Sequence, residues 1–292
     1  MRFEGIIPAV TTPFDDSGAV DQVALERNVR ALLDGGVHGL VATGTMGEAA
    51  SLSVTERRTV VETVAAAAAG SVPVIAGVSS STPGQVAALA ADAAAAGAGA
   101  IMLLPPLAYR AADREIVQWY TAAAQSGMPV MAYNNPEASG TDMPAPLIAR
   151  LADVEGVVAV KECSGDTRRI PAILEAAEGR LEVLVGGDDW ALEGFCAGAT
   201  GWVSGVADVA PAECVALYEH CRDGELEPAR ELYRRLLPLG RFDMTPKLVQ
   251  YFKAAMDAVG YAGGPARPPR LELTEDERAA LDAALAALRV PA

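Results

Sequence analysis

The sequence predicts a (β/α)8 barrel followed by a helical C-terminal extension. Three observations predict it: eight short apolar runs, a helix-like stretch after most of them, and consecutive helices without strands after the eighth run. An open sheet is disfavoured because residues 11–14, after the first run, lack the glycine pattern of a dinucleotide-binding turn. We expect a catalytic barrel domain at 1–224 and the extension at 225–292.

The expected strands are the apolar runs themselves. Each run is short and continuously apolar rather than alternating, as is typical of parallel strands that are covered on both faces. We expect strands at 6–10, 39–43, 72–76, 100–104, 129–133, 157–161, 181–185 and 200–203.

The expected helices are marked by start and stop residues. The helix at 21–34 begins at Asp21, whose carboxylate can cap it, and ends at Gly35. The helix at 83–96 opens with Pro83, which suits a first helical position. Further barrel helices are expected at 55–69, 113–126, 144–151, 166–177, 189–197 and 212–222, and extension helices at 227–237, 247–259 and 274–288.

Composition narrows the possible partners. Hydrophobic residues make up 51% of the 292-residue chain, and 38 acidic against 23 basic residues give a formal charge of -15. So acidic a chain disfavours nucleic acid and anionic membranes as partners. Four cysteines and two histidines form neither a disulfide framework nor a metal-ligand spacing, and no targeting or membrane-spanning segment stands out. We expect a cytoplasmic protein without metal or cofactor.

Two reactive side chains end neighbouring strands. Lys161 closes the sixth expected strand, where desolvation would lower the pKa of its amine and free it to attack a carbonyl. Tyr133 closes the fifth strand, where a phenol can relay protons. Taken singly, Lys161 could equally reach solvent, and Tyr133 is more commonly a packing residue.

Two glycine-containing turns follow the second and seventh strands. Gly44, Thr45 and Met46 open a turn whose amides and hydroxyl can hold a carboxylate, although an ordinary βα turn is a strong alternative. After the seventh strand, Gly187 can admit substrate, and Asp188 and its neighbour are expected to cap the next helix. Chemistry collects at the C-terminal ends of barrel strands, so this set suits Schiff-base chemistry on a 2-oxo acid.

The ordered motifs along the chain resemble a known superfamily. They comprise the opening Pro8–Phe14 segment, Gly44–Glu48, Pro105-Pro106, Tyr133–Pro136, Lys161–Asp166 and Gly187–Asp189. In order and spacing they are similar to the dihydrodipicolinate synthase / N-acetylneuraminate lyase superfamily, over essentially the whole chain. The resemblance implies a class I, Schiff-base lyase on a (β/α)8 barrel with extra C-terminal helices.

The resemblance also implies roles for particular residues. Lys161 resembles the Schiff-base lysine, and Tyr133 the tyrosine that shuttles protons to and from the substrate. Thr45, with the amide of Met46, resembles the group that holds the carboxylate of the 2-oxo acid. Gly187 and Val203 match backbone positions that line the pocket. The family is commonly a homotetramer, so we expect a homo-oligomer, either tetramer or dimer.

Three positions depart from the synthases of lysine biosynthesis. The second threonine of the turn, which passes protons to a tyrosine of a neighbouring subunit, is Met46. The two tyrosines expected after the proline pair are Leu107 and Ala108; Tyr109 comes one step late, and whether it substitutes is open. The arginine that grips the second substrate's carboxylate has no counterpart in 137–140. Lysine biosynthesis is therefore disfavoured.

The same departures indicate the substrate class. Met46, Leu107 and Ala108 make an apolar wall that suits a small 2-oxo acid better than a long polyhydroxy substrate. Retro-aldol cleavage, dehydration and deamination share the same lysine imine and enamine intermediates. The sequence does not decide which of these three reactions the enzyme performs. Two alternatives remain: a 4-hydroxy-tetrahydrodipicolinate synthase, and a catalytically impaired 2-oxo acid binding protein of the same fold.

Overall fold

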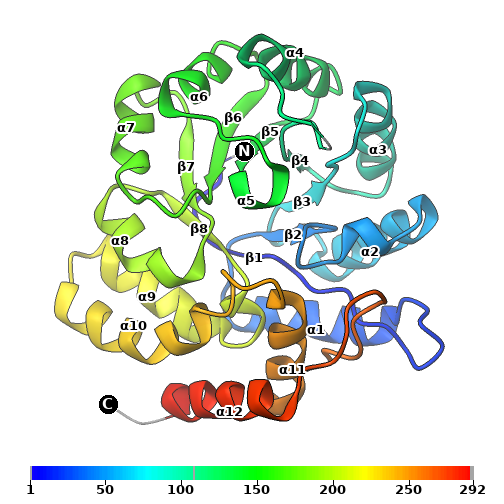
Figure 1. Ribbon diagram of the computed structural model, residues 1–292, viewed down its shortest axis with the longest axis vertical. Helices are drawn as coiled ribbons and strands as arrows, with labels where there is room; N and C mark the ends of the chain where they lie inside the picture. Colours follow the sequence, from blue (N-terminus) through cyan, green and yellow to red (C-terminus); the bar gives the residue numbers. More distant parts are fainter. Residues whose placement is uncertain (1, 108, 290–292) are drawn as a thin grey trace.

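The eight predicted strands form one parallel barrel. The computed structural model describes residues 2–107 and 109–289, so the expectation for Ala108 lies outside the described residues (Figure 1). The strand order is β1-β8-β7-β6-β5-β4-β3-β2, and β1 meets β2 through a parallel bridge between Ala9 and Val41. The amide of Val10 donates to the carbonyl of Val41 (3.0 Å) and so closes this seam. The (β/α)8 fold class is confirmed.

Each strand lies where an apolar run predicted it. All are buried except for single, partly covered residues, because the strands have the barrel interior on one face and helices on the other. The strands are β1 (Gly5–Pro8), β2 (Leu40–Ala42), β3 (Val74–Gly77), β4 (Ala100–Leu103), β5 (Val130–Asn134), β6 (Val157–Glu162), β7 (Glu182–Val185) and β8 (Gly201–Ser204).

Helices surround the barrel and continue beyond it. In Figure 1 they ring the strands, and the last three lie together along one side. The barrel helices are α1 (Gln22–Asp34), α2 (Val54–Ala68), α3 (Pro83–Ala95), α4 (Asp113–Ala124), α6 (Ala145–Leu151), α7 (Arg169–Ala176), α8 (Ala191–Cys196) and α9 (Pro211–Arg222). The extension holds α10 (Leu226–Gly240), α11 (Leu248–Val259) and α12 (Glu275–Arg289).

Capping side chains fix several of these helix starts. Asp21 accepts a hydrogen bond from the amide of Ala24 (2.9 Å) at the start of α1. Ser53 and Glu56 form a capping box at the start of α2, with bonds of 2.8 and 3.2 Å. Each cap satisfies backbone amides that have no partner inside the helix, which is why these helices begin where the sequence placed them.

Short elements that the sequence did not predict occur in the loops. They are α5 (Pro136–Ser139), η1 (Ala49–Ser51), η2 (Asp188–Trp190) and η3 (Val206–Asp208). Two expected helices start late: α7 begins only at Arg169, because Asp166 forms a local turn with Arg168, and α8 begins at Ala191, after η2. These loop elements all follow strand ends, where they shape the mouth of the barrel.

The extension packs back onto the barrel. Helix α10 lies against α9 and α12, and α11 contacts α12. The link between α10 and α11, residues 241–247, reaches the C-terminal mouth of the barrel. No helix in the described ranges is both long and apolar enough to cross a membrane.

Candidate active site

A cavity opens at the C-terminal ends of the strands. Its volume is about 210 Å³, and its wall combines strand-end residues with the link between α10 and α11. Six of the residues singled out in the sequence line it: Gly44, Thr45, Met46, Tyr133, Lys161 and Val203. Among the described lining residues, Gly186 takes the place expected for Gly187.

Lys161 and Tyr133 lie side by side in this cavity. They are register partners on β6 and β5, so both side chains leave the sheet on the same face. The Lys161 ammonium lies 4.3 Å from the centre of the Tyr133 ring, and both residues are more than nine-tenths buried. The arrangement puts an amine and a phenol within reach of one bound molecule.

Lys161 is the only one of the three lysines that reaches the cavity. The Lys247 ammonium is paired with Glu277 (2.7 Å), and the Lys253 ammonium with Glu48 (2.8 Å). All three lysines lie in the described part of the chain. A lysine-dependent reaction in this cavity therefore has one candidate nucleophile.

The pKa of Lys161 moves in the opposite direction from the one expected. Burial lowers the pKa of the amine, as the sequence suggested, but Tyr133, Cys163 and Asp243 together outweigh burial and raise it above its ordinary value of 10.5. The resting lysine is therefore an ammonium. It must pass a proton to a neighbour before it attacks a carbonyl.

Tyr133 is held in place by Asn135. The Asn135 amide nitrogen donates to the Tyr133 phenol oxygen (2.9 Å) and lies 3.7 Å from the Cys163 sulfur. Burial raises the pKa of Tyr133, so the phenol stays protonated at neutral pH. Burial also raises the pKa of Cys163 to about 12, so this thiol is neutral as well. Tyr133 and Cys163 are thus neutral hydrogen-bonding groups beside the Lys161 cation.

Gly186 makes room for the lysine. A Cβ atom at this position would lie 2.7 Å from the Cβ of Cys163 and 3.0 Å from the Cε of Lys161. Only a residue without a side chain fits there without displacing Lys161.

Asp188 does not cap the next helix as expected. Its carboxylate accepts hydrogen bonds from the Ser204 hydroxyl (2.9 Å) and the Val206 amide (2.9 Å), beyond the end of β8. Its own amide donates to the Asp243 carboxylate (3.2 Å). Asp188 therefore joins the seventh and eighth strand ends to the link between α10 and α11.

The turn after β2 is closed and strained. The amide of Glu48 donates to the carbonyl of Thr45 (3.1 Å), and the Thr12 hydroxyl donates to the carbonyl of Gly47 (2.8 Å). Thr43 and Glu48, on either side of it, have φ angles of 55° and 53°, a left-handed conformation that costs a non-glycine residue about 1–3 kcal/mol. The surrounding contacts must hold these two residues in place.

The C-terminal segment supplies part of that support. Glu48 is fully buried and pairs with the buried ammonium of Lys253. The backbone amide of Arg267 also donates to the Glu48 carboxylate (3.0 Å). The turn is thereby tied to α11 and to the chain that follows α11.

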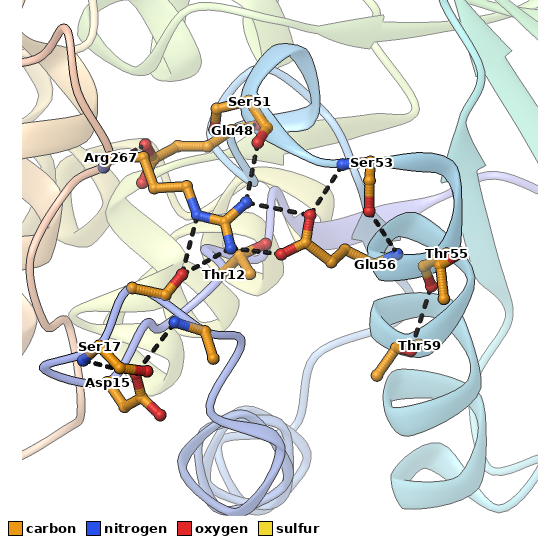
Figure 2. A network of polar contacts seen from close by, with 12 residues as sticks. Thr12, Asp15, Ser17, Glu48, Ser51, Ser53, Thr55, Glu56, Thr59 and Arg267 are labelled. Atoms are coloured by element: carbon orange, nitrogen blue, oxygen red, sulfur yellow. Dashed lines mark hydrogen bonds and ion pairs between the residues drawn. The ribbon is translucent and has the colours of Figure 1, made fainter.

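The side chain of Arg267 makes further contacts beside the bond from its amide to Glu48. Figure 2 shows its guanidinium between Glu56 of α2 and the carbonyl of Ser51, to which it donates at 2.8 Å. It also donates to the carbonyl of Gly18 (2.6 Å). This pairing and the capping bonds hold the pKa of Glu56 down at about 2. The contacts bind the N-terminal loop and the start of α2 to the C-terminal segment.

We expect Glu56→Gln to lower stability in a pH-dependent way. A carboxylate whose folded-state pKa is depressed stabilises the fold above its unfolded-state value of 4.5, and the effect fades as pH falls towards about 2. The unfolding free energies of the two proteins should differ at neutral pH and converge in acid. Urea denaturation across this range measures the difference, and a gap that stays constant with pH would contradict the assignment.

Two cavity acids were not predicted from the sequence. Glu137 lies on α5 and is exposed at the mouth, and Asp243 lies in the link between α10 and α11. Burial raises the pKa of Asp243 to about 6, although nearby Lys161 opposes the shift. The only available signal for Asp243 was an acid in a short break between two helices.

Of the positions that departed from the expected motifs, Met46 and Glu137 line the cavity, whereas Leu107 and Tyr109 are not among its described lining residues. Leu107 packs against the core, and Tyr109 is 53% exposed and absent from the described cavity wall. Met46 does line the cavity and is 4% exposed. Within one chain, Tyr109 therefore does not act as the missing phenol.

The whole chain matches one known family. The sequence profile of the Dihydrodipicolinate synthetase family matches residues 2–288. The chain belongs to this family. Relatives include the 4-hydroxy-tetrahydrodipicolinate synthase of Methanothrix thermoacetophila, 37% identical, with 96% of this chain and 95% of the relative covered. An uncharacterized DapA-like lyase of Halobacterium salinarum is 34% identical, with 99% and 95% covered.

Solved structures of the dihydrodipicolinate synthetase family have the same fold. Dihydrodipicolinate synthase DapA-2 of Bacillus anthracis has a TM-score of 0.94 and 30% identity, with both chains fully covered. The dihydrodipicolinate synthase of Acinetobacter baumannii, solved with pyruvate, has a TM-score of 0.93 and 29% identity, with 98% of this chain and 99% of that one covered. The protein is a class I aldolase-type lyase that forms a lysine Schiff base with a small 2-oxo acid.

Proposed function

We propose that Lys161 forms the Schiff base and that the enzyme eliminates water or ammonia from a small 2-oxo acid with a single carboxylate. The supporting observation is the charge of the cavity wall: two carboxylates, Glu137 and Asp243, face a single cation, Lys161. A second substrate carboxylate would meet repulsion there, whereas hydroxyl or amino groups would be accepted.

The proposed roles follow the geometry. Lys161 attacks C2 of the substrate, and Tyr133 carries protons to and from the carbinolamine. Thr45, with the backbone of Gly44 and Met46, binds the substrate carboxylate. Val203 lines the cavity together with Gly186, which takes the role expected for Gly187. The protonated imine then acidifies C3, so that a leaving group on C4 can depart.

A substrate panel tests the proposed function. Purified enzyme is offered 4-hydroxy- and 4-amino-2-oxo monocarboxylic acids, and pyruvate with aspartate semialdehyde, while borohydride traps the imine. We expect water or ammonia release from the first group and a reduced adduct on the Lys161 peptide. An adduct on another lysine, or no adduct with any 2-oxo acid, would contradict the site.

A second candidate is 4-hydroxy-tetrahydrodipicolinate synthase, because curated relatives up to 37% identical carry that name. Condensation of pyruvate with aspartate semialdehyde as the fastest reaction in the panel would favour it over elimination. A catalytically impaired binding protein would form the trapped adduct and yet release no product from any substrate.

We also propose that the enzyme is a cytoplasmic homo-oligomer, a tetramer or dimer. The support is the resemblance to commonly tetrameric enzymes. The exposed Tyr109 is free to contact another subunit. Light scattering on the purified protein gives the mass in solution, and a monomer would contradict this proposal.

A further inference from the structure

The link between α10 and α11 places a carboxylate in the same cavity as the proposed imine lysine. Asp243, Met244 and Thr245 of this link line the same cavity as Lys161 and Tyr133. No barrel strand provides this side of the wall; the C-terminal extension does. A molecule bound to Lys161 therefore shares the cavity with Asp243, whose charge also acts on the Lys161 amine.

The Asp243 side chain is fixed by the backbone. The amide of Asp188 donates to one oxygen of its carboxylate (3.2 Å). Asp188 is itself held by Ser204 and by the amides of Gly205 and Val206. A carboxylate anchored through one oxygen can present the other to a substrate without reorganising.

We propose that Asp243 is the catalytic acid–base that carries a proton between C3 of the imine-bound substrate and the leaving group on C4. The proposal rests on the Schiff base at Lys161 and adds a residue that the strand-end motifs do not contain. Asp243 is proposed as a catalytic residue because it faces the cavity in which the reacting atoms are bound.

The proton and electron balance is complete without a co-reactant. Asp243 takes the C3 proton, the C3–H pair forms the C2–C3 double bond, and the iminium nitrogen accepts the displaced π pair as a lone pair. This enamine lone pair then returns, a C3–C4 double bond forms, and the C4–O or C4–N bond breaks. The leaving group accepts the proton from Asp243 and departs as water or ammonia. Nothing is oxidised or reduced, and water later hydrolyses the imine.

The charges around Asp243 support both halves of this cycle. Burial and Asp189 on η2 favour its protonated form, while Lys161 on β6 and the Asp188 amide favour the ionised form, and the resulting pKa is about 6. The buried Asp188 carboxyl beside it has a pKa raised well above its usual value, by burial first and by Asp243 second. Tyr133 and Cys163, on β5 and just after β6, face it as neutral groups, and Glu137 lies at the mouth. Asp243 is thus a base beside the cationic iminium. Once the enamine is neutral, that stabilisation disappears, the pKa of Asp243 rises, and the carboxyl keeps the proton until the leaving group accepts it.

Deuterium exchange into pyruvate isolates this step. In heavy water the wild-type enzyme should exchange the C3 protons of pyruvate, with a rate that falls as pH drops below about 6. Asp243→Asn should slow exchange by about 10²- to 10⁴-fold, as expected when a general base is lost. Borohydride should still trap pyruvate on Lys161 in this variant. Asp276→Asn, which removes an exposed carboxylate on α12, is the matched control and should exchange at the wild-type rate.

The outcomes separate the two proposals. No trapped adduct in the wild-type protein would defeat the Schiff-base assignment at Lys161. A trapped adduct with undiminished exchange in Asp243→Asn, or a loss of exchange that only matches a loss of adduct, would overturn the role of Asp243. If Asp243→Asn does not fold, Asp243→Glu is the deciding variant. A changed exchange rate together with a shift in the pH at which exchange falls supports the proposal, and a rate and pH dependence equal to those of the wild type refute it.

Discussion

Lys161→Arg should remove nearly all activity, by about 10⁴- to 10⁶-fold, as loss of a catalytic nucleophile does in other enzymes. A guanidinium keeps its charge at any accessible pH and cannot attack a carbonyl. The substitution preserves a cation beside Tyr133 and Asp243, so the local charge balance changes little. Product formation from the best substrate of the panel measures the loss of turnover, and borohydride trapping measures the loss of the imine.

Lys247→Arg provides the matched control for this prediction. Lys247 pairs with Glu277 outside the cavity, and an arginine can make the same pair. We expect wild-type turnover and a normal adduct at Lys161 in this variant. Substantial turnover by Lys161→Arg would show that the enzyme works without an imine at this residue.

Lys253→Met should destabilise the fold by about 3–5 kcal/mol, which is typical when one partner of a buried ion pair is removed. The Lys253 side chain is 2% exposed and its Glu48 partner 0% exposed, so the carboxylate left behind cannot be solvated. Arg270 lies 3.4 Å from the other oxygen of Glu48 and offsets part of the loss. Urea unfolding of both proteins gives the difference in free energy.

Lys247→Met is the control for burial. The Lys247–Glu277 pair has exposed fractions of 32% and 27%, and partly exposed pairs of this kind contribute at most about 1 kcal/mol. Glu48→Gln combined with Lys253→Met should cost less than the sum of the two single changes, because the pair is removed together. Equal effects of Lys253→Met and Lys247→Met would mean that the buried pair does not hold the turn.

The sequence predicted the barrel because its signals are local. Continuous apolar runs mark strands, and Asp21 and Ser53 mark the helix starts after them. Lys161 and Tyr133 were also accessible, since residues that end adjacent parallel strands must meet at one edge. The sequence alone therefore predicted that these two side chains lie close together.

The rest of the site depends on how distant segments meet. Asp243 carries no local mark of a cavity residue, because only the path of the extension over the barrel mouth brings it to Lys161. The prediction for the pKa of Lys161 was wrong for the same reason. The position of Lys161 in a strand indicates its burial, but it does not indicate that Tyr133, Cys163 and Asp243 surround the amine and raise its pKa. Likewise, Asp188 binds the loop after β8 instead of its own helix.

The hydrogen bond between Arg267 and Gly18 has a consequence for how the chain folds during its synthesis. The two residues are 249 positions apart, so the guanidinium that joins them leaves the ribosome long after Gly18. Strands emerging earlier can pair with their neighbours as they appear, whereas contacts of such long sequence separation form late. A nascent chain that stalls before Arg267 would carry Lys161 and Tyr133 on barrel strands while the turn after β2 still lacks its contacts with the C-terminal segment. The contacts around this turn are thus completed only after Arg267 has emerged.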